Sequence, residues 1–210
     1  MEILKTNGVK KAKQVEPIKN KKDLMKLVTY LKATNLRNYT IVVVGMNVLL
    51  RAGDLLELKW SDVLEEDMTF KRKIWITEEK TNKQKEIRFN HDSIDALTLY
   101  KDSLNPFHVN DYIFTSRKVN KNGEKKLDVK ALHKIIKDTC TELNIKGNFG
   151  THTLRKTGAY HIYNDHIATN PALLTRLQKI LNHSSQAATL RYIGIETQET
   201  DDIFDHFKLF

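Results

Sequence analysis

Six side chains in this 210-residue sequence have the types needed to attack and stabilise an anionic group. They are Arg51, Lys80, His152, Arg155, His183 and Tyr192. Arginine offers a planar pair of donors to phosphate or carboxylate oxygens, and histidine exchanges protons near neutral pH. A tyrosine phenol has a pKa near ~10, so it becomes a useful nucleophile only where its neighbours help it lose its proton. The set suits attack by a phenol on a phosphate whose developing charge the arginines stabilise.

The spacing of these residues indicates which elements must hold them. His152 and Arg155 are three residues apart in THTLRKTGAY, which puts them on one face of a helix. His183 closes the next helical segment in LNHSS, and Tyr192 follows nine residues later in TLRYIGI. Arg51 stands at a helix junction in LLRAGDLLELKW, and Lys80 stands at the tip of an expected hairpin in EEKTNK.

Hydrophobic periodicity and turn residues predict a mostly helical chain with one small sheet. Helices are expected at 24–34, 35–50, 91–104, 128–145, 152–165, 171–183 and 185–194, with Asp23 and Asp128 as N-caps of the first and fourth. A short turn and helix are expected at 51–63, a β-hairpin at 73–89 and a short extended segment at 111–116. The predicted fold class is α+β, with the antiparallel sheet inserted after the second helix.

The charge balance points to a polyanionic partner. The sequence has 35 Lys and Arg against 26 Asp and Glu, a formal net charge of +9. Excess positive charge raises the local concentration of polyanions and speeds their capture. The basic residues gather in three stretches, at 1–22, 71–88 and 117–137. Separated stretches suit a surface that follows a phosphate backbone better than a pocket for a small acid.

Several other classes of protein are excluded. The single cysteine, Cys140, rules out an intramolecular disulfide framework and is expected to be a packing residue in a reducing cytoplasm. The longest apolar run, 41–50, is well short of the ~20 residues of a membrane span. The sequence has no HExxH motif, no Cys/His cluster and no GxxxxGK(S/T) motif, so neither a metal nor a nucleotide cofactor is expected.

Five motifs occur in an order typical of one family. RAGDLLELKWSDV, the hairpin EKTNKQKEI, HTLR, LNHSS and TLRYIGI resemble the signature motifs of the tyrosine recombinases, the phage integrase family. The resemblance runs from about residue 22 to residue 195. It implies that family's catalytic domain, with the DNA breaking–rejoining fold: mainly helical, with a small three-stranded antiparallel sheet. It also implies a cytoplasmic protein of bacterial or phage origin.

The resemblance assigns a role to each residue of the set. Arg51 resembles the first catalytic arginine, Lys80 the hairpin lysine, His152 the histidine of HxxR, Arg155 the second arginine, His183 the His/Trp position and Tyr192 the nucleophile. Asp54 stands where the family often has an acidic residue, and is expected either to orient an arginine or histidine or to cap a helix. Lys83 and Lys85 share the basic hairpin, and the alternative for any of these three lysines is that it only contacts backbone phosphate.

The implied activity is site-specific DNA recombination of the integrase or invertase type, through a 3′-phosphotyrosine link and without metal or nucleotide. The expected partner is double-stranded DNA. The protein is expected to be a monomer or weak oligomer when free and a tetramer on paired recombination sites, with accessory DNA-bending proteins as further candidate partners. Two alternatives stay open: relaxation of DNA in the manner of a type IB topoisomerase, and non-catalytic DNA binding by the same fold.

The domain organisation predicted is an arm, one domain and a tail. Residues 1–21 are expected to be a flexible basic arm, 22–196 the catalytic domain and 197–210 a helical tail. Apolar residues in the tail recur at about helical spacing, so the tail is expected either to dock on a neighbouring subunit or to pack in cis. Full-length phage integrases usually have a core-binding domain before the catalytic one, which makes this chain either a stand-alone catalytic-domain protein or a fragment.

One departure from the family pattern concerns the turn before the first arginine. The family usually reads Gly-Leu-Arg there, whereas this sequence reads Leu49-Leu50-Arg51. A leucine in place of glycine is expected to alter the turn without removing the arginine.

Overall fold

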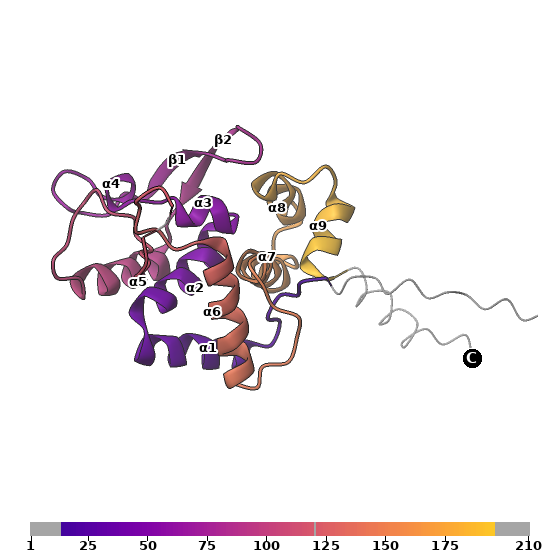
Figure 1. Cartoon of the computed structure of the whole chain (residues 1–210). Helices are drawn as coiled ribbons and strands as arrows, with labels where there is room; N and C mark the ends of the chain where they lie inside the picture. The colour runs from indigo at the N-terminus through magenta and orange to yellow at the C-terminus, as the bar shows by residue number, and fades with distance from the viewer. Residues whose placement is uncertain (1–13, 120, 196–210) are drawn as a thin grey trace, which may run out of the picture.

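A computed structural model describes residues 14–119 and 121–195, and the expected tail and most of the expected arm lie outside these ranges. The elements follow one another from α1 near the N-terminus to α9, and the segment before α1 runs back toward the end of α9 (Figure 1). None of the helices within the described ranges is long and apolar enough to cross a membrane.

The described part of the chain is mainly helical, as the sequence predicts. Its helices are α1 (Lys21–Thr34), α2 (Leu36–Val48), α3 (Ala52–Leu56), α4 (Trp60–Val63), α5 (His91–Asp102), α6 (Val129–Glu142), α7 (Thr153–His166), α8 (Leu173–Leu181) and α9 (Gln186–Ile193). Asp128 caps α6 as expected, through a hydrogen bond from the backbone N–H of Ala131. The expected N-cap Asp23 is wrong, because α1 begins three residues earlier than predicted and the Asn20 side chain accepts from the N–H groups of its first turn.

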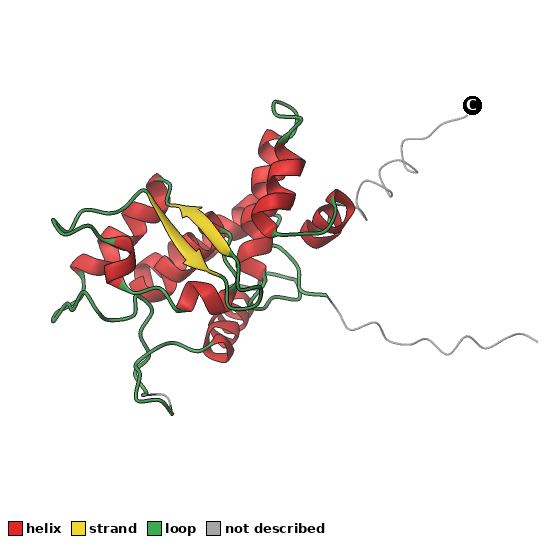
Figure 2. Ribbon diagram, turned by 90° about the horizontal axis from the view of Figure 1, so that it is seen from above, coloured by secondary structure: helices red, strands yellow, loops and turns green. Residues whose placement is uncertain are grey.

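The sheet is smaller than expected. Strands β1 (Lys73–Thr77) and β2 (Gln84–Arg88) pair antiparallel, with Ile74 opposite Ile87, and form the predicted hairpin (Figure 2). The third strand that the family resemblance implied is not formed in the described ranges. The described residues instead form isolated antiparallel bridges, one of which joins Leu64 to Phe70. The expected extended segment at 111–116 forms two others, with Lys59 and with Lys126. The α+β class is confirmed, with two strands rather than three.

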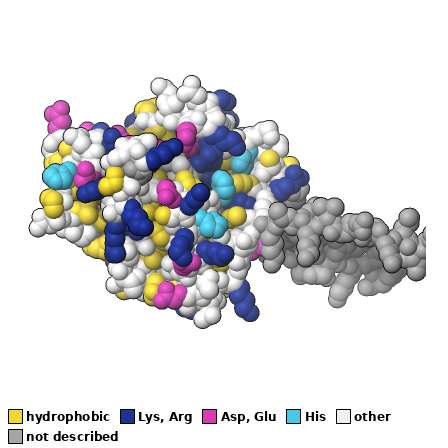
Figure 3. Space-filling view, in the orientation of Figure 1, with side chains coloured by type: hydrophobic (Ala, Val, Ile, Leu, Met, Phe, Trp, Pro, Cys, Tyr) yellow, Lys and Arg dark blue, Asp and Glu magenta, His cyan; other side chains and the backbone are white. Residues whose placement is uncertain are grey.

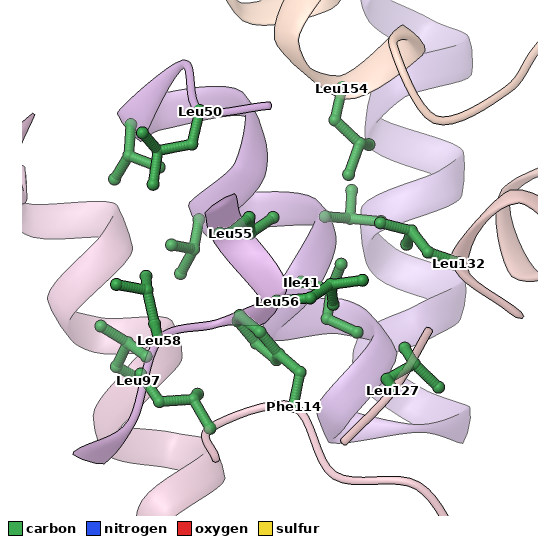
Figure 4. Packing of buried hydrophobic residues seen from close by; sticks show 14 of the residues in the cluster. Ile41, Leu50, Leu55, Leu56, Leu58, Leu97, Phe114, Leu127, Leu132 and Leu154 are labelled. Atoms are coloured by element: carbon green, nitrogen blue, oxygen red, sulfur yellow. The ribbon is translucent and has the colours of Figure 1, made fainter. Parts of the chain in front are cut away.

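Helix α2 organises the larger of two hydrophobic clusters. It packs against α1, α5 and α7, so its middle is buried nearly all round. Figure 4 shows Ile41 of α2 beside Leu55 and Leu56 of α3, with Leu97 of α5 and Phe114 closing the cluster. Each such fully buried side chain stabilises the fold by ~1.5–3 kcal/mol. This core fixes α2, and with it the junction that carries Arg51.

A close crossing of α2 and α7 joins the two halves of the predicted site. A Cβ on Gly158 would lie 1.8 Å from the backbone oxygen of Met46, and one on Gly45 would lie 2.9 Å from Leu154 Cδ1. Only glycine permits this approach of the two backbones. The crossing brings the start of α7, with Arg155, next to the C-terminal end of α2.

The second hydrophobic cluster is smaller and lies around the last two helices. Buried side chains of α7, α8 and α9 form it, together with Leu49 from the end of α2. Leu49 has the left-handed backbone conformation (φ 52°, ψ 37°) that a glycine would adopt without strain. Arg51 follows this turn directly, and the Leu49 side chain links the two clusters; an altered turn relative to the family stays a prediction.

Candidate active site

Arg51 follows the left-handed turn at the end of α2 and is the N-cap residue of α3. Its Nη1 lies 2.7 Å from Oε1 of Glu78, whose side chain is 2% exposed. Burial alone would raise the pKa of Glu78, but the ion pair with Arg51 and a hydrogen bond from the Thr81 hydroxyl hold it below its ordinary value. A charged Glu78 fixes one edge of the guanidinium.

The hairpin turn is tied to α3 by a second buried carboxylate. Asp54 Oδ1 accepts a hydrogen bond from the backbone N–H of Glu79 at 3.0 Å, and the side chain is buried. Asp54 Oδ2 is also buried and has no hydrogen-bond partner. In this position Asp54 holds the hairpin turn against the Arg51 junction. The proposed role of Asp54 in orienting an arginine or histidine stays a prediction.

Two of the three hairpin lysines, Lys80 and Lys85, lie in different surroundings. Lys80 is exposed in the turn, close enough to His152 for its charge to lower the pKa of that imidazole. Lys85 comes from β2 and is half-buried, with its Nζ 3.4 Å from the carbonyl oxygen of Leu49. Burial, and then the charge of Arg155, lowers the pKa of Lys85 to about 8. Lys85 is thus the more buried of the two lysines, and the charges of both arginines act on it. Lys80 lies at the rim of the site.

Helix α7 presents His152 and Arg155 at its start. Arg155 is buried, and its Nη2 donates to the carbonyl oxygen of Leu181 at the end of α8 at 2.8 Å. A cation is favourable there because the last carbonyls of a helix carry partial negative charge. His152 is more exposed, and burial, Arg155 and Lys156 lower its pKa below the ordinary histidine value. At pH 7 the His152 imidazole is therefore neutral and able to accept a proton.

His183 lies in the loop between α8 and α9. Its Nδ1 lies 3.1 Å from the hydroxyl of Thr189, which also lies 3.2 Å from the backbone oxygen of Ser185. When that hydroxyl donates to Ser185 O, Nδ1 is the donor and Nε2 of the neutral ring can accept a proton. Burial and the charges of Arg155 and Arg51 lower the pKa of His183.

Tyr192, on α9, lies against these groups in cis. Its ring centroid is 4.8 Å from that of His183, in an edge-on arrangement, and 4.7 Å from Lys156 Nζ. Burial raises the pKa of the Tyr192 phenol, and the charges of Arg155 and Arg51 oppose that shift. Tyr160 and Tyr163, on the helix that carries Arg155, pack in the smaller cluster as well. The charges of both arginines act on the Tyr192 phenol.

The structure brings the six predicted residues to one region. Glu78, Lys85 and Lys156 also lie there, and the sequence did not predict the contacts that these three make. Every second residue of the hairpin strands points inward. Glu78 follows Ile74 and Ile76 in this alternation, and Lys85 precedes Ile87, so the alternation in the sequence could have identified both. Lys156 lies in a run of buried residues, 153–157, that no amphipathic pattern predicts. Among the described residues, no group of three or more His, Cys, Asp or Glu side chains could hold a metal ion.

Comparisons with known proteins identify the family. The profile of the phage integrase family matches residues 18–199. A probable integrase/recombinase of Bacillus subtilis, YoeC, is 32% identical over 186 residues, which cover 89% of this chain and 93% of the relative. The tyrosine recombinase XerC of Caldanaerobacter subterraneus subsp. tengcongensis is 27% identical over 166 residues, and the chain spans 42% of its length.

Solved structures show the same fold at lower sequence identity. The XerA recombinase superposes with a TM-score of 0.66 at 22% identity, over 94% of this chain and 66% of XerA. The XerH recombinase, solved on a palindromic difH substrate after cleavage, gives 0.65 at 20% identity, over 92% of this chain and 54% of XerH. The family profile spans most of the chain, and the relatives that share it are named integrases and tyrosine recombinases, so this chain belongs to the phage integrase family of tyrosine recombinases.

Proposed function

We propose that this chain cleaves and rejoins strands of double-stranded DNA at specific sites, with Tyr192 as the nucleophile. The observation that carries the proposal is the meeting of Tyr192 with Arg51, Arg155 and His183 in one chain. Lys and Arg side chains are spread over the face seen in Figure 3, with His side chains among them, as a surface for a phosphate backbone requires. Relatives of the same fold, XerH among them, were solved on DNA, which supports the same partner here.

The first step transfers a phosphoryl group from DNA to the phenol. The Tyr192 oxygen bonds to phosphorus while the bond from phosphorus to the 5′-oxygen breaks, and the phenol proton passes to a neutral imidazole, His183 or His152. Arg51 and Arg155 donate to the nonbridging oxygens, whose negative charge grows in the transition state. The product is a 3′-phosphotyrosine and a free 5′-hydroxyl. Attack by a second 5′-hydroxyl on the same phosphorus reverses the step and joins a new strand.

The leaving 5′-oxygen needs a proton, and the hairpin supplies the donor. Lys80 is exposed at the rim of the site, where the scissile strand would lie, and we assign it this role. Lys85 is held inside the site, and we assign it a fixed positive charge beside the phosphate. On paired sites we propose a tetramer, because exchange of strands between two duplexes needs four cleavages.

A covalent adduct on DNA tests the proposal. The protein is incubated with a pool of nicked duplexes of random central sequence, in which cleavage releases a short strand and traps the phosphotyrosine. Denaturing gels are expected to show DNA bound covalently to wild type and to Tyr163→Phe but not to Tyr192→Phe. The trapped duplexes are sequenced, and this captured DNA then serves as the substrate.

The same experiment separates the alternatives. If wild type binds the pool tightly but forms no adduct, the proposal is wrong and the protein is a DNA-binding protein of this fold. If an adduct forms but two captured sites on one plasmid are only relaxed and never recombined, the activity is that of a type IB topoisomerase.

A further inference from the structure

The segment just before α1, residues 14–20, is fastened along α7 and is called the strap here. Its main chain is held by Glu16 N to Asn148 O at 2.9 Å and by the Thr153 hydroxyl to Glu16 O at 3.0 Å. Further along, Ile18 N donates to the Thr157 hydroxyl at 2.9 Å. The strap therefore has a fixed position on the helix that carries Arg155, although the sequence predicts residues 1–21 as a flexible arm.

The strap also reaches the helix that carries the nucleophile. Lys19 Nζ donates to the backbone oxygen of Gly194, the C-cap of α9, at 2.7 Å. Strap residues, Lys156 and Tyr192 line one pocket of about 530 Å³. A segment that touches both α7 and the end of α9 can influence how the Tyr192 ring lies between them.

Lys156 is a buried cation inside this contact. Its side chain is 4% exposed, and its Nζ lies 4.7 Å from the centroid of the Tyr192 ring. Burial lowers the pKa of Lys156, and the carboxylate of Glu16 in the strap opposes that shift. Burying an ammonium is costly unless an anion or an aromatic ring compensates, and here the Tyr192 ring lies against it.

The proposed mechanism gives Lys156 no part, yet its place suits the nucleophile. A cation on a ring is attracted to the neutral phenol and more strongly to the phenolate, over which the negative charge spreads. The other charged or titratable groups that face Tyr192 are Arg155 on α7, Arg51 before α3 and His183 after α8. Of these four groups, Lys156 is the one in contact with the strap.

We propose that Lys156 is a positioning residue that holds the Tyr192 ring for attack, and that the strap, bonded to the end of α9 through Lys19, fixes this contact. The inference rests on the proposed function of Tyr192. It makes the segment before α1 part of the apparatus that orients the nucleophile.

The first test needs no DNA. Protein labelled with ¹³Cζ-tyrosine is titrated by NMR, and the Tyr192 signal is the one that Tyr192→Phe removes. Lys156→Met is expected to raise the pKa of Tyr192 by about one unit, and Lys156→Arg is expected to restore it. The control is Lys146→Met, an exposed lysine of the same pocket, which is expected to leave the Tyr192 pKa unchanged. Lys156→Gln is measured in parallel, so that the result does not depend on the folding of one variant.

The second test uses the captured DNA. Lys156→Met is expected to slow adduct formation roughly 10- to 30-fold at unchanged DNA affinity. Lys19→Met, which removes the bond from the strap to Gly194 O, is expected to slow it about threefold in the wild-type background and less in Lys156→Met. Wild-type rates and an unchanged Tyr192 pKa in Lys156→Met and Lys156→Gln would overturn the inference. Absence of any adduct with wild type would instead refute the proposed function, and the titration would still decide the role of Lys156.

Discussion

The two hydrophobic clusters carry different parts of the site. The larger one holds α2, α3 and the hairpin, and so fixes Arg51, Glu78 and Lys85. The smaller one holds α8 and α9, with His183 and Tyr192 at its edge. Helix α7 belongs to both, because Leu154 packs in the larger cluster and Ala159 in the smaller. Arg51, which we propose binds phosphate, and Tyr192, the proposed nucleophile, therefore come from separately packed regions, and Arg155 lies on the helix that both share.

This difference has a consequence for how the site is held together. The smaller cluster buries less apolar surface, so we expect it to open at a lower free energy than the larger one. Contacts that cross between the regions include the Arg155 bond to Leu181, the Lys19 bond to Gly194, the Lys156 contact with Tyr192 and the side chain of Leu49. In the proposed mechanism these contacts set the nucleophile against the phosphate-binding groups.

The largest effect is expected at Arg155, which serves both regions. Arg155→Lys keeps a positive charge but loses the paired donors and the geometry of the bond to Leu181 O. Adduct formation on the captured DNA is expected to fall about 10²- to 10³-fold, and the melting temperature is expected to fall with it. Arg51→Lys is the comparison, since Arg51 pairs within the larger region. It should slow cleavage without loosening α9. Equal hydrogen exchange of α9 in the two variants would contradict the division of roles.

The hairpin lysines sharpen the comparison by separating two steps. Lys80→Met is expected to slow cleavage about 10²-fold on ordinary DNA and hardly at all on DNA with a 5′-thiolate leaving group, which needs no proton. Lys85→Met should slow cleavage on both substrates, because it removes a charge beside the phosphate.

The dependence of the cleavage rate on pH tests the same distinction between Lys80 and Lys85. Because the pKa of Lys85 is about 8, its positive charge is lost as the pH rises through that value. The apparent second-order rate of wild type is therefore expected to fall above pH 8 on both substrates. In the leaving-group experiment, the DNA with the 5′-thiolate could restore cleavage by Lys85→Met and not by Lys80→Met. That result would make Lys85 the proton donor and Lys80 the fixed charge.

The crossing of α2 and α7 can be broken directly. Gly158→Ala places a methyl group 1.8 Å from Met46 O, so the two helices must separate. The free energy of unfolding is expected to fall by about 3 kcal/mol, measured by urea denaturation. Gly53→Ala is the control, because its new Cβ would meet only Glu79 Oε2 at 3.4 Å, an ordinary contact. A stability loss as large in Gly53→Ala would show that the crossing has no special role.

The smallest effect is expected as a difference in stability between two substitutions of Leu49, and the order of the two variants is unusual. Leu49→Ala loses a buried side chain and keeps the left-handed strain, whereas Leu49→Gly loses the side chain and relieves the strain. Gly is therefore expected to be more stable than Ala at this position by about 1 kcal/mol. In both variants amide exchange should rise in α8 and α9 more than in α5. Uniform exchange across the chain would mean that the two clusters open as one.

Much of the fold follows from local patterns. The helix periodicities predict α1, α2 and α5–α9, and the strand composition around Trp75 predicts the hairpin. The third strand fails because the pairing of short segments such as Leu64 with Phe70 is decided by tertiary contacts. The N-cap of α1 is misplaced because Asn20 and Asp23 are both good caps and the sequence alone does not rank them.

The site is predicted as a set of residues rather than as an arrangement. The motifs identify Arg51 and Tyr192, which lie far apart in the sequence, and the structure puts both within electrostatic reach of each other. Which hairpin lysine faces inward depends on the register of β2, which places Lys85 opposite Ile76. The role of Lys156 depends on the strap, whose path along α7 no local pattern encodes.

The most direct test of the central claim is to locate the covalent bond. The adduct with captured DNA is digested with nuclease and protease, and the modified peptide is sequenced by mass spectrometry. The nucleotide remnant is expected on Tyr192, joined through its 3′-phosphate. A remnant on Tyr160, Tyr163 or any other residue, or one joined through a 5′-phosphate, would contradict the account.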